Sequence, residues 1–140
     1  NGNRTQKLNY NFVNEPDLAQ TFVVTCVLLN IPFRFTGLQS LKIKETDRIE
    51  ALKTELRKLG YLLADRGDSI LEWNGERCEP QAHPVIATYE DHRMAMAFAP
   101  AALVLPEGIE IADPQVVSKS YPHYWRDLRT AGFIIIDNEQ

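Results

Sequence analysis

The feature that most constrains the fold of this 140-residue chain is an internal repeat of about 74 residues. Hydrophobic periodicity predicts the element order βαβαββ over about residues 7–73 and βαβαβ over about residues 84–140. Asp17 in the first unit matches Asp91 in the second, and each stands where a helix should begin. The sequence therefore predicts an α/β fold of the α+β type, in which two βαβαββ-like units pack about a shared axis.

The same periodicity predicts the individual elements. The first unit should hold strands and helices in this order: a strand over 7–13, a helix entered at 14–17 and running to 29, a strand over 31–35, a helix ending at 59, and strands over 61–64 and 69–73. After a connection over 74–84, the second unit should hold strands over 85–88, 109–112 and 133–136 and helices over 91–103 and 120–131. Pro100 should kink or end the first of these two helices early.

Residues 41–48 form the junction between a predicted strand end and the second helix of the first unit. Leu41 and Ile43 alternate with lysines, which is typical of a half-buried strand. Thr46 is predicted as the N-cap of the helix and Gly60 as the residue just past its C-terminus. Free backbone N–H groups at this helix N-terminus favour a bound anion, so the charged side chains around it are candidate site residues.

Equivalent helix N-termini converge in a repeated structure, and here they carry several cations. Arg48, Arg93 and Lys119 stand where the helix dipole favours acids. An anionic ligand would resolve this conflict, because an arginine can bond two oxygens of a carboxylate or phosphate at once. Asp17 and Glu45, beside these cations, are then candidates for proton transfer.

Each of these residues also has a purely structural interpretation. Asp17 and Asp91 are equally well explained as acids at helix starts, and His92 as a buried, hydrogen-bonded histidine. On this structural interpretation, the charged side chains at 41–48 form an ordinary solvated loop before an amphipathic helix. Three further acids are expected on the surface, namely Glu55, Glu72 and Glu76.

Composition limits the classes of protein to which the chain can belong. A hydrophobic content of 44% over 140 residues supports one sizeable core, so residues 1–140 are expected to form a single domain. The net charge of −4 argues against nucleic-acid and membrane partners, which select basic faces. Two scattered cysteines favour a reducing, cytoplasmic setting, and three scattered histidines predict no metal site. Because the chain starts at Asn1 without a methionine, we expect a piece of a longer protein.

Four motifs stand in order along the chain: EPDLAQ at 15–20, KETDR at 44–48, YEDHRMAM at 89–96 and SKSYP at 118–122. With these motifs in register, the chain closely resembles the C-terminal part of the EPSP synthase (3-phosphoshikimate 1-carboxyvinyltransferase) family. The resemblance implies the enolpyruvyl transferase fold, with helices buried between sheets and three βαβαββ units in each of two domains. The chain would then be about two units of the domain that carries the C-terminus.

The resemblance also implies an activity: transfer of the enolpyruvyl group of phosphoenolpyruvate to the 5-hydroxyl of shikimate 3-phosphate, with release of phosphate, in chorismate and aromatic amino acid biosynthesis. It implies that Asp17 contacts the shikimate ring hydroxyl as its base and that Lys44 hydrogen-bonds the same substrate. Glu45 would move the proton at the enolpyruvyl methylene. Phosphoenolpyruvate would be bound by three cations, Arg48, Arg93 and Lys119. No cofactor and no metal is implied.

The implied partners are the two small-molecule substrates and the missing N-terminal domain of the same chain, in a monomer. Because that domain supplies further substrate contacts, the fragment alone is expected to be inactive. One alternative is the related UDP-N-acetylglucosamine enolpyruvyl transferase, whose residues differ at 44–48 and 91–96. Others are a non-catalytic substrate half-site, or an unrelated anion-binding or RNA-processing module of the same fold; the acidic composition argues against the RNA-processing function.

Overall fold

The computed structural model describes residues 7–136 except 45, 68, 106–107 and 119. Its first unit contains β1 (Leu8–Asn11), α1 (Ala19–Leu28), β2 (Phe33–Thr36), α2 (Arg48–Lys58), β3 (Ala64–Arg66) and β4 (Ile70–Trp73). The strands form one sheet in the order β1-β2-β4-β3, in which β1 and β2 are parallel and β4 is antiparallel to both of its neighbours. This is the βαβαββ order that periodicity predicted.

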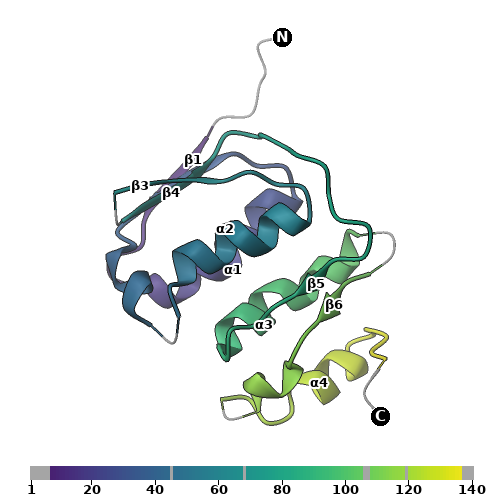
Figure 1. Ribbon diagram of the computed structural model, residues 1–140. Coiled ribbons are helices and arrows are strands. Elements are labelled where there is room, and N and C mark those ends of the chain that lie inside the picture. The colour runs from purple at the N-terminus through teal and green to yellow at the C-terminus, as the bar shows by residue number, and fades with distance from the viewer. Residues whose placement is uncertain (1–6, 45, 68, 106–107, 119, 137–140) are drawn as a thin grey trace.

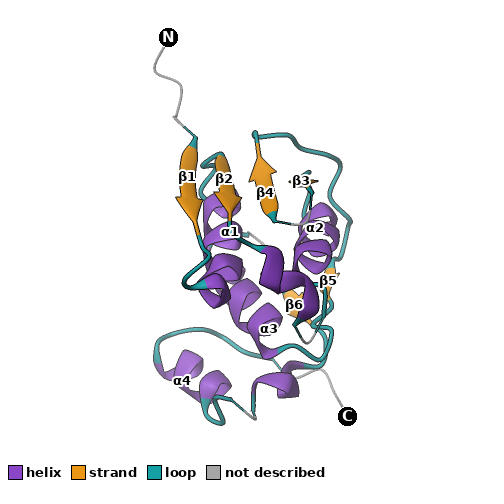
Figure 2. Cartoon of the chain, turned by 90° about the vertical axis from the view of Figure 1, so that its left-hand side faces the viewer, coloured by secondary structure: helices purple, strands orange, loops and turns teal. Residues whose placement is uncertain are grey.

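The first unit is built in layers, with α1 and α2 on one face of the sheet and α3 beyond them (Figures 1 and 2). Alternation along β2 buries Phe33 and Phe35 against the helices, and β4 adds Leu71 and Trp73 to the same core. Because α1 is apolar nearly all round, it packs against both β2 and α3.

The second unit contains β5 (Val85–Ile86), α3 (His92–Phe98), β6 (Glu110–Ile111) and α4 (Tyr124–Thr130), and β5 and β6 pair in parallel. The strand predicted over 133–136 is wrong, because these residues have no regular secondary structure. Ile134 and Ile136 are 91% and 77% exposed. A strand needs a neighbour to satisfy its backbone, and no strand of the described part pairs with this segment.

Both helices of the second unit are shorter than predicted. Pro100 ends α3 early, as expected, and the chain continues as a 3₁₀ helix over Ala99–Leu103. None of the residues of α4 is buried. Two of its aromatic side chains bond to backbone carbonyls: Tyr124 Oη donates to Met96 O at 3.4 Å, and Trp125 Nε1 donates to Pro114 O at 2.9 Å.

The junction before α2 differs from its prediction. Residues Gln39–Ile43 form a 3₁₀ helix rather than a strand end. Leu38 and Leu41, three residues apart, are buried, whereas Ile43 is 82% exposed, so the apolar spacing is that of a 3₁₀ turn. The N-cap of α2 is Asp47 and not Thr46, because the Asp47 carboxylate accepts the backbone N–H of Glu50 at 3.1 Å.

Two of the three acids expected on the surface are buried. Glu55 is 1% and Glu72 6% exposed, whereas Glu76 is exposed as predicted. Both buried carboxylates lie beside cations: Lys58 at 2.7 Å from Glu55, and Arg66 at 3.0 Å from Glu72. The hydrogen bond from Arg66 lowers the pKa of Glu72 from its ordinary value. A cation beside each carboxylate therefore offsets part of the cost of burying its charge.

Candidate anion-binding active site

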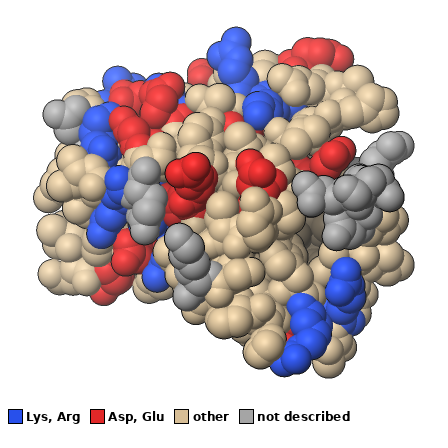
Figure 3. All heavy atoms as spheres, turned by 60° about the horizontal axis from the view of Figure 1, so that its bottom comes forward, with Lys and Arg blue, Asp and Glu red and all other residues tan. Residues whose placement is uncertain are grey.

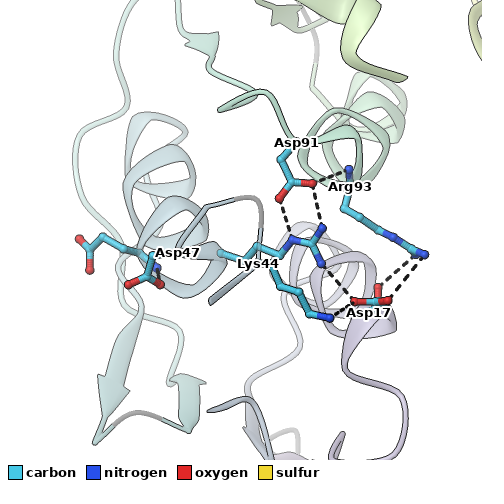
Figure 4. Close-up of polar contacts among 7 residues, drawn as sticks. Asp17, Lys44, Asp47, Asp91 and Arg93 are labelled. Atoms are coloured by element: carbon cyan, nitrogen blue, oxygen red, sulfur yellow. Dashed lines mark hydrogen bonds and ion pairs between the residues drawn. The ribbon is translucent and has the colours of Figure 1, made fainter. Parts of the chain in front are cut away.

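Three helices, α1, α2 and α3, begin at one place and bring their N-terminal residues together, as the repeat predicted (Figure 4). Asp17 lies in the 3₁₀ turn Pro16–Leu18 that leads into α1. Arg48 is the first residue of α2, and Asp91 is the N-cap of α3 with Arg93 in its first turn. Side-chain caps, Asp47 and Asp91, fix the starts of α2 and α3. Packing of the helices brings the three starts together.

The centre of the cluster is a buried ion pair between α2 and α3. Arg48 Nε donates to Asp91 Oδ2 at 2.7 Å and Arg48 Nη2 to Asp91 Oδ1 at 3.1 Å, a two-point contact (Figure 4). Asp91 is fully buried and the Arg48 side chain is 2% exposed. Asp91 Oδ1 also accepts the backbone N–H of Arg93 at 2.9 Å. One carboxylate therefore caps α3 and fixes Arg48.

The Asp17 carboxylate lies at the open side of this pair. Its Oδ1 accepts from Arg48 Nη1 at 3.1 Å and is 3.6 Å from Lys44 Nζ. Its Oδ2 is 4.0 Å from Arg93 Nη2, and Arg93 Nη1 donates to the Asp17 backbone carbonyl at 3.3 Å. Asp17 is thus bordered by three cations while 45% of its side chain remains exposed.

The described members of the cluster, hereafter the cation cluster, are Asp17, Lys44, Arg48, Asp91 and Arg93. Three cations face two carboxylates, so the cluster is one positive charge in excess. Lys44 and Arg93 are 33% and 36% exposed, and solvent reaches both. An anion arriving from solvent would meet these two side chains and the helix N-termini behind them.

The structure brings together four of the predicted site residues, Asp17, Lys44, Arg48 and Arg93. Glu45 and Lys119 lie outside the described residues. Asp91 was weighed only as an acid at a helix start, and its pairing with Arg48 was not predicted. The repeat held a signal for it, because Asp91 is the counterpart of Asp17.

Three further observations concern metal ions, surface charge and membrane spans. In the part of the chain that the structure describes, no group of three or more histidine, cysteine or acidic side chains is placed to hold a metal ion. Figure 3 shows the α4 side of the molecule, where basic side chains lie in separate groups with acidic ones between them. None of the described helices is long and apolar enough to cross a bilayer.

Comparison with known proteins gives the family. The sequence pattern of EPSP synthase (3-phosphoshikimate 1-carboxyvinyltransferase) matches residues 4–128. The 3-phosphoshikimate 1-carboxyvinyltransferase of Bacteroides fragilis (strain YCH46) is 71% identical over all 140 residues, which are 34% of that protein. The enzyme of the same name from Rhizobium etli (strain CIAT 652) is 40% identical to this chain. The match covers 83% of this chain and 28% of the Rhizobium protein.

A solved structure of EPSP synthase from Acinetobacter baumannii superposes with a TM-score of 0.69 at 24% identity, covering 84% of this chain and 27% of that one. This likeness shows that the fold is shared, as the α/β prediction implied. The chain spans about a third of the length of the curated relatives it matches. By the match of its sequence along nearly its whole length, this chain belongs to the EPSP synthase family.

Proposed function

We propose that this chain acts as the C-terminal part of a 3-phosphoshikimate 1-carboxyvinyltransferase. The reaction would move the enolpyruvyl group of phosphoenolpyruvate to the 5-hydroxyl of shikimate 3-phosphate and release phosphate. The observation that carries the proposal is the cation cluster, in which one half-exposed carboxylate, Asp17, is bordered by three cations at helix N-termini.

The chemistry needs a proton donor, a base and fixed positive charge. Protonation of the phosphoenolpyruvate methylene leaves a cationic carbon, which the 5-hydroxyl attacks as its own proton leaves. The resulting tetrahedral intermediate loses phosphate by cleavage of its C–O bond and loses a methyl proton to restore the double bond. Preorganised cations stabilise the charge that develops on the departing phosphate.

The family pattern suggests a role for each predicted site residue, and the contacts among Asp17, Lys44, Arg48 and Arg93 support the roles of these four. Asp17 would accept the proton of the 5-hydroxyl, and Lys44 would donate to the same substrate. Glu45 would move the proton at the methylene carbon. The anionic groups of phosphoenolpyruvate would be held by Arg48, Arg93 and Lys119.

The contacts of Asp17 suggest how substrate binding would prepare the base. Lys44 and Arg93 now lie near the Asp17 carboxylate, at 3.6 and 4.0 Å. An anionic substrate would compete for both cations and free one lone pair of Asp17 for the hydroxyl. Arg48, held from two nitrogens by Asp91, would stay in place as the fixed charge of the site.

The proposal extends to the domain organisation, the partners and the cellular location of the protein. Residues 1–140 would form part of the one domain that carries the C-terminus, with repeats over about 7–73 and 84–140. The rest of a full-length chain would supply the other half of the substrate site. We propose a cytoplasmic monomer that uses no nucleic-acid or membrane partner.

Replacement of Arg93 by alanine in the full-length protein tests the site. We expect the Kd for phosphoenolpyruvate to rise at least ~10-fold and that for shikimate 3-phosphate to change less than ~3-fold, because a charged hydrogen bond contributes ~1.5–3 kcal/mol. Isothermal titration with each ligand measures both constants. Arg129→Ala, on the exposed face of α4, is the matched control and should change neither. Equal losses for the two ligands would contradict the assignment.

A further inference from the structure

A second buried charge cluster lies two helical turns along α2 from the cation cluster. Its centre is Glu55, which is 1% exposed and was expected on the surface. Glu55 Oε1 accepts the backbone N–H of Ala87 at 3.0 Å and lies 2.7 Å from Lys58 Nζ. Its Oε2 accepts the hydroxyl of Tyr89 at 2.5 Å. Both oxygens therefore hold the segment that leads from β5 to α3.

That segment has an unusual backbone. Tyr89 and Glu90 are consecutive non-glycine residues in the left-handed region, with φ of +57° and +56°. Such residues persist where surrounding contacts hold them. The next residue is Asp91, so the path of this turn decides where the α3 N-terminus and Arg93 lie.

Helix geometry explains how α2 holds both ends of the segment. Arg48 and Glu55 are seven residues apart, which places them on the same face of the helix, two turns from one another. Arg48 contacts Asp91 at the end of the segment, while Glu55 contacts Ala87 at its start. Burial and the hydrogen bond to Glu55 raise the pKa of Tyr89, so its hydroxyl remains a donor. The segment is thus held from one rigid element.

We propose that Glu55 is a positioning residue of the active site: through Ala87 and Tyr89 it fixes the left-handed turn that places Asp91 against Arg48 and Arg93 beside Asp17. Lys58 completes the arrangement, because its ammonium group neutralises Glu55 and donates to Val85 O at 3.0 Å. The expected effect of Glu55 on substrate binding and catalysis rests on the proposed function. The claim that Glu55 restrains the turn does not depend on it.

The test uses three changes in the full-length protein. Tyr89→Phe removes the hydroxyl alone, Glu55→Gln keeps an acceptor for the Ala87 N–H, and Glu55→Ala removes both contacts. The matched control is Glu72→Gln, which changes a buried acid of β4 that contacts Arg66 and Lys7. Hydrogen exchange of the peptide over 85–93, Kd for each substrate, and kcat are measured for every variant.

We expect exchange over 85–93 to quicken at least ~10-fold in Glu55→Ala, the scale of one or two lost hydrogen bonds, with smaller increases in Glu55→Gln and Tyr89→Phe. The Kd for phosphoenolpyruvate should rise in the same order, with shikimate 3-phosphate affected less. The control should leave exchange over 85–93 and both constants unchanged. If phosphoenolpyruvate affinity and slow exchange over 85–93 are partly retained in Glu55→Gln but lost in Glu55→Ala, the role of Glu55 is to position the turn.

Exchange that quickens evenly over the whole protein would overturn the proposal, because it would show that Glu55 acts on global stability alone. Unchanged phosphoenolpyruvate binding in Glu55→Ala would overturn it as well. A wild-type protein without transferase activity would refute the proposed function instead. Faster exchange confined to 85–93 would even then support the restraint of the turn by Glu55.

Discussion

At the scale of single residues, two buried polar side chains of the described structure differ in whether they have hydrogen-bond partners. Asp91 is fully buried yet accepts three hydrogen bonds, two from Arg48 and one from the Arg93 backbone. Gln20, in the first turn of α1, is also fully buried, but neither polar atom of its amide has a hydrogen-bond partner among the described residues. Burial of an amide without partners costs free energy that an apolar side chain of the same shape does not.

We therefore expect Gln20→Met to stabilise the protein by ~1 kcal/mol, because methionine fills a similar volume without an unsatisfied amide. Urea unfolding of the two proteins measures the difference. Gln81→Met, at an exposed position, controls for the change of residue type and should have little effect. A loss of stability in Gln20→Met would show that the amide has an internal partner such as a bound water.

At the scale of elements, α2 is the helix on which both charge clusters depend, and its two ends are fixed by local motifs. Asp47 caps its N-terminus. At its C-terminus Tyr61 N donates to Leu56 O and Gly60 N to Arg57 O, each at 3.0 Å, which is a Schellman motif. Gly60 has a φ of +99°, and a β-carbon there would lie 3.0 Å from the carbonyl oxygen of Cys78. The predicted glycine position is confirmed.

Gly60→Ala should lower the free energy of unfolding by at least ~1 kcal/mol, because alanine is strained at this φ. Gly75→Ala is the matched control: its φ of +93° is similar, but its new β-carbon would have no described atom within 4 Å. The loss of unfolding free energy in Gly60→Ala beyond that in Gly75→Ala measures the cost of the close contact between the new β-carbon and Cys78 O. Equal costs in chemical denaturation would contradict a role for that contact.

At the scale of the whole molecule, apolar surface is exposed beside the candidate site's helices. Phe22 of α1 and Leu29, the C-cap of that helix, are 46% and 58% exposed, and Leu103 is 72% exposed. Asp17 and Arg93 also remain open to solvent. Since the relatives are about three times as long, we expect their remaining chain to cover part of this surface.

The 140-residue chain alone is accordingly expected to fold but to release no phosphate from the two substrates, because the reaction needs water excluded and all groups placed together. Chemical shifts on adding phosphoenolpyruvate should cluster near Arg48 and Arg93, with weak binding. A phosphate-release assay, with the full-length protein as positive control, measures turnover. Release above the blank without protein would show that the site is self-contained.

Much of this architecture follows from local sequence. The N-cap at Asp91, the helix end at Gly60 and the early end of α3 at Pro100 were all predicted, because capping and termination depend on residues within one turn. The βαβαββ order of the first unit follows from periodicity in the same way. Convergence of helix starts was predicted from the repeat, and with it the grouping of Asp17 with Arg48.

Contacts between distant segments account for the rest. The pairing of Arg48 with Asp91 joins residues 43 positions apart, and Glu55 is buried by partners 32 and 34 positions away. No local pattern records such partners, so Glu55 resembled a surface acid. The apolar segment over 133–136 has strand-like composition but no strand beside it in the described structure. Backbone N–H and C=O groups need hydrogen-bond partners, and buried charges need opposite charges. Which groups become these partners depends on how the whole chain packs.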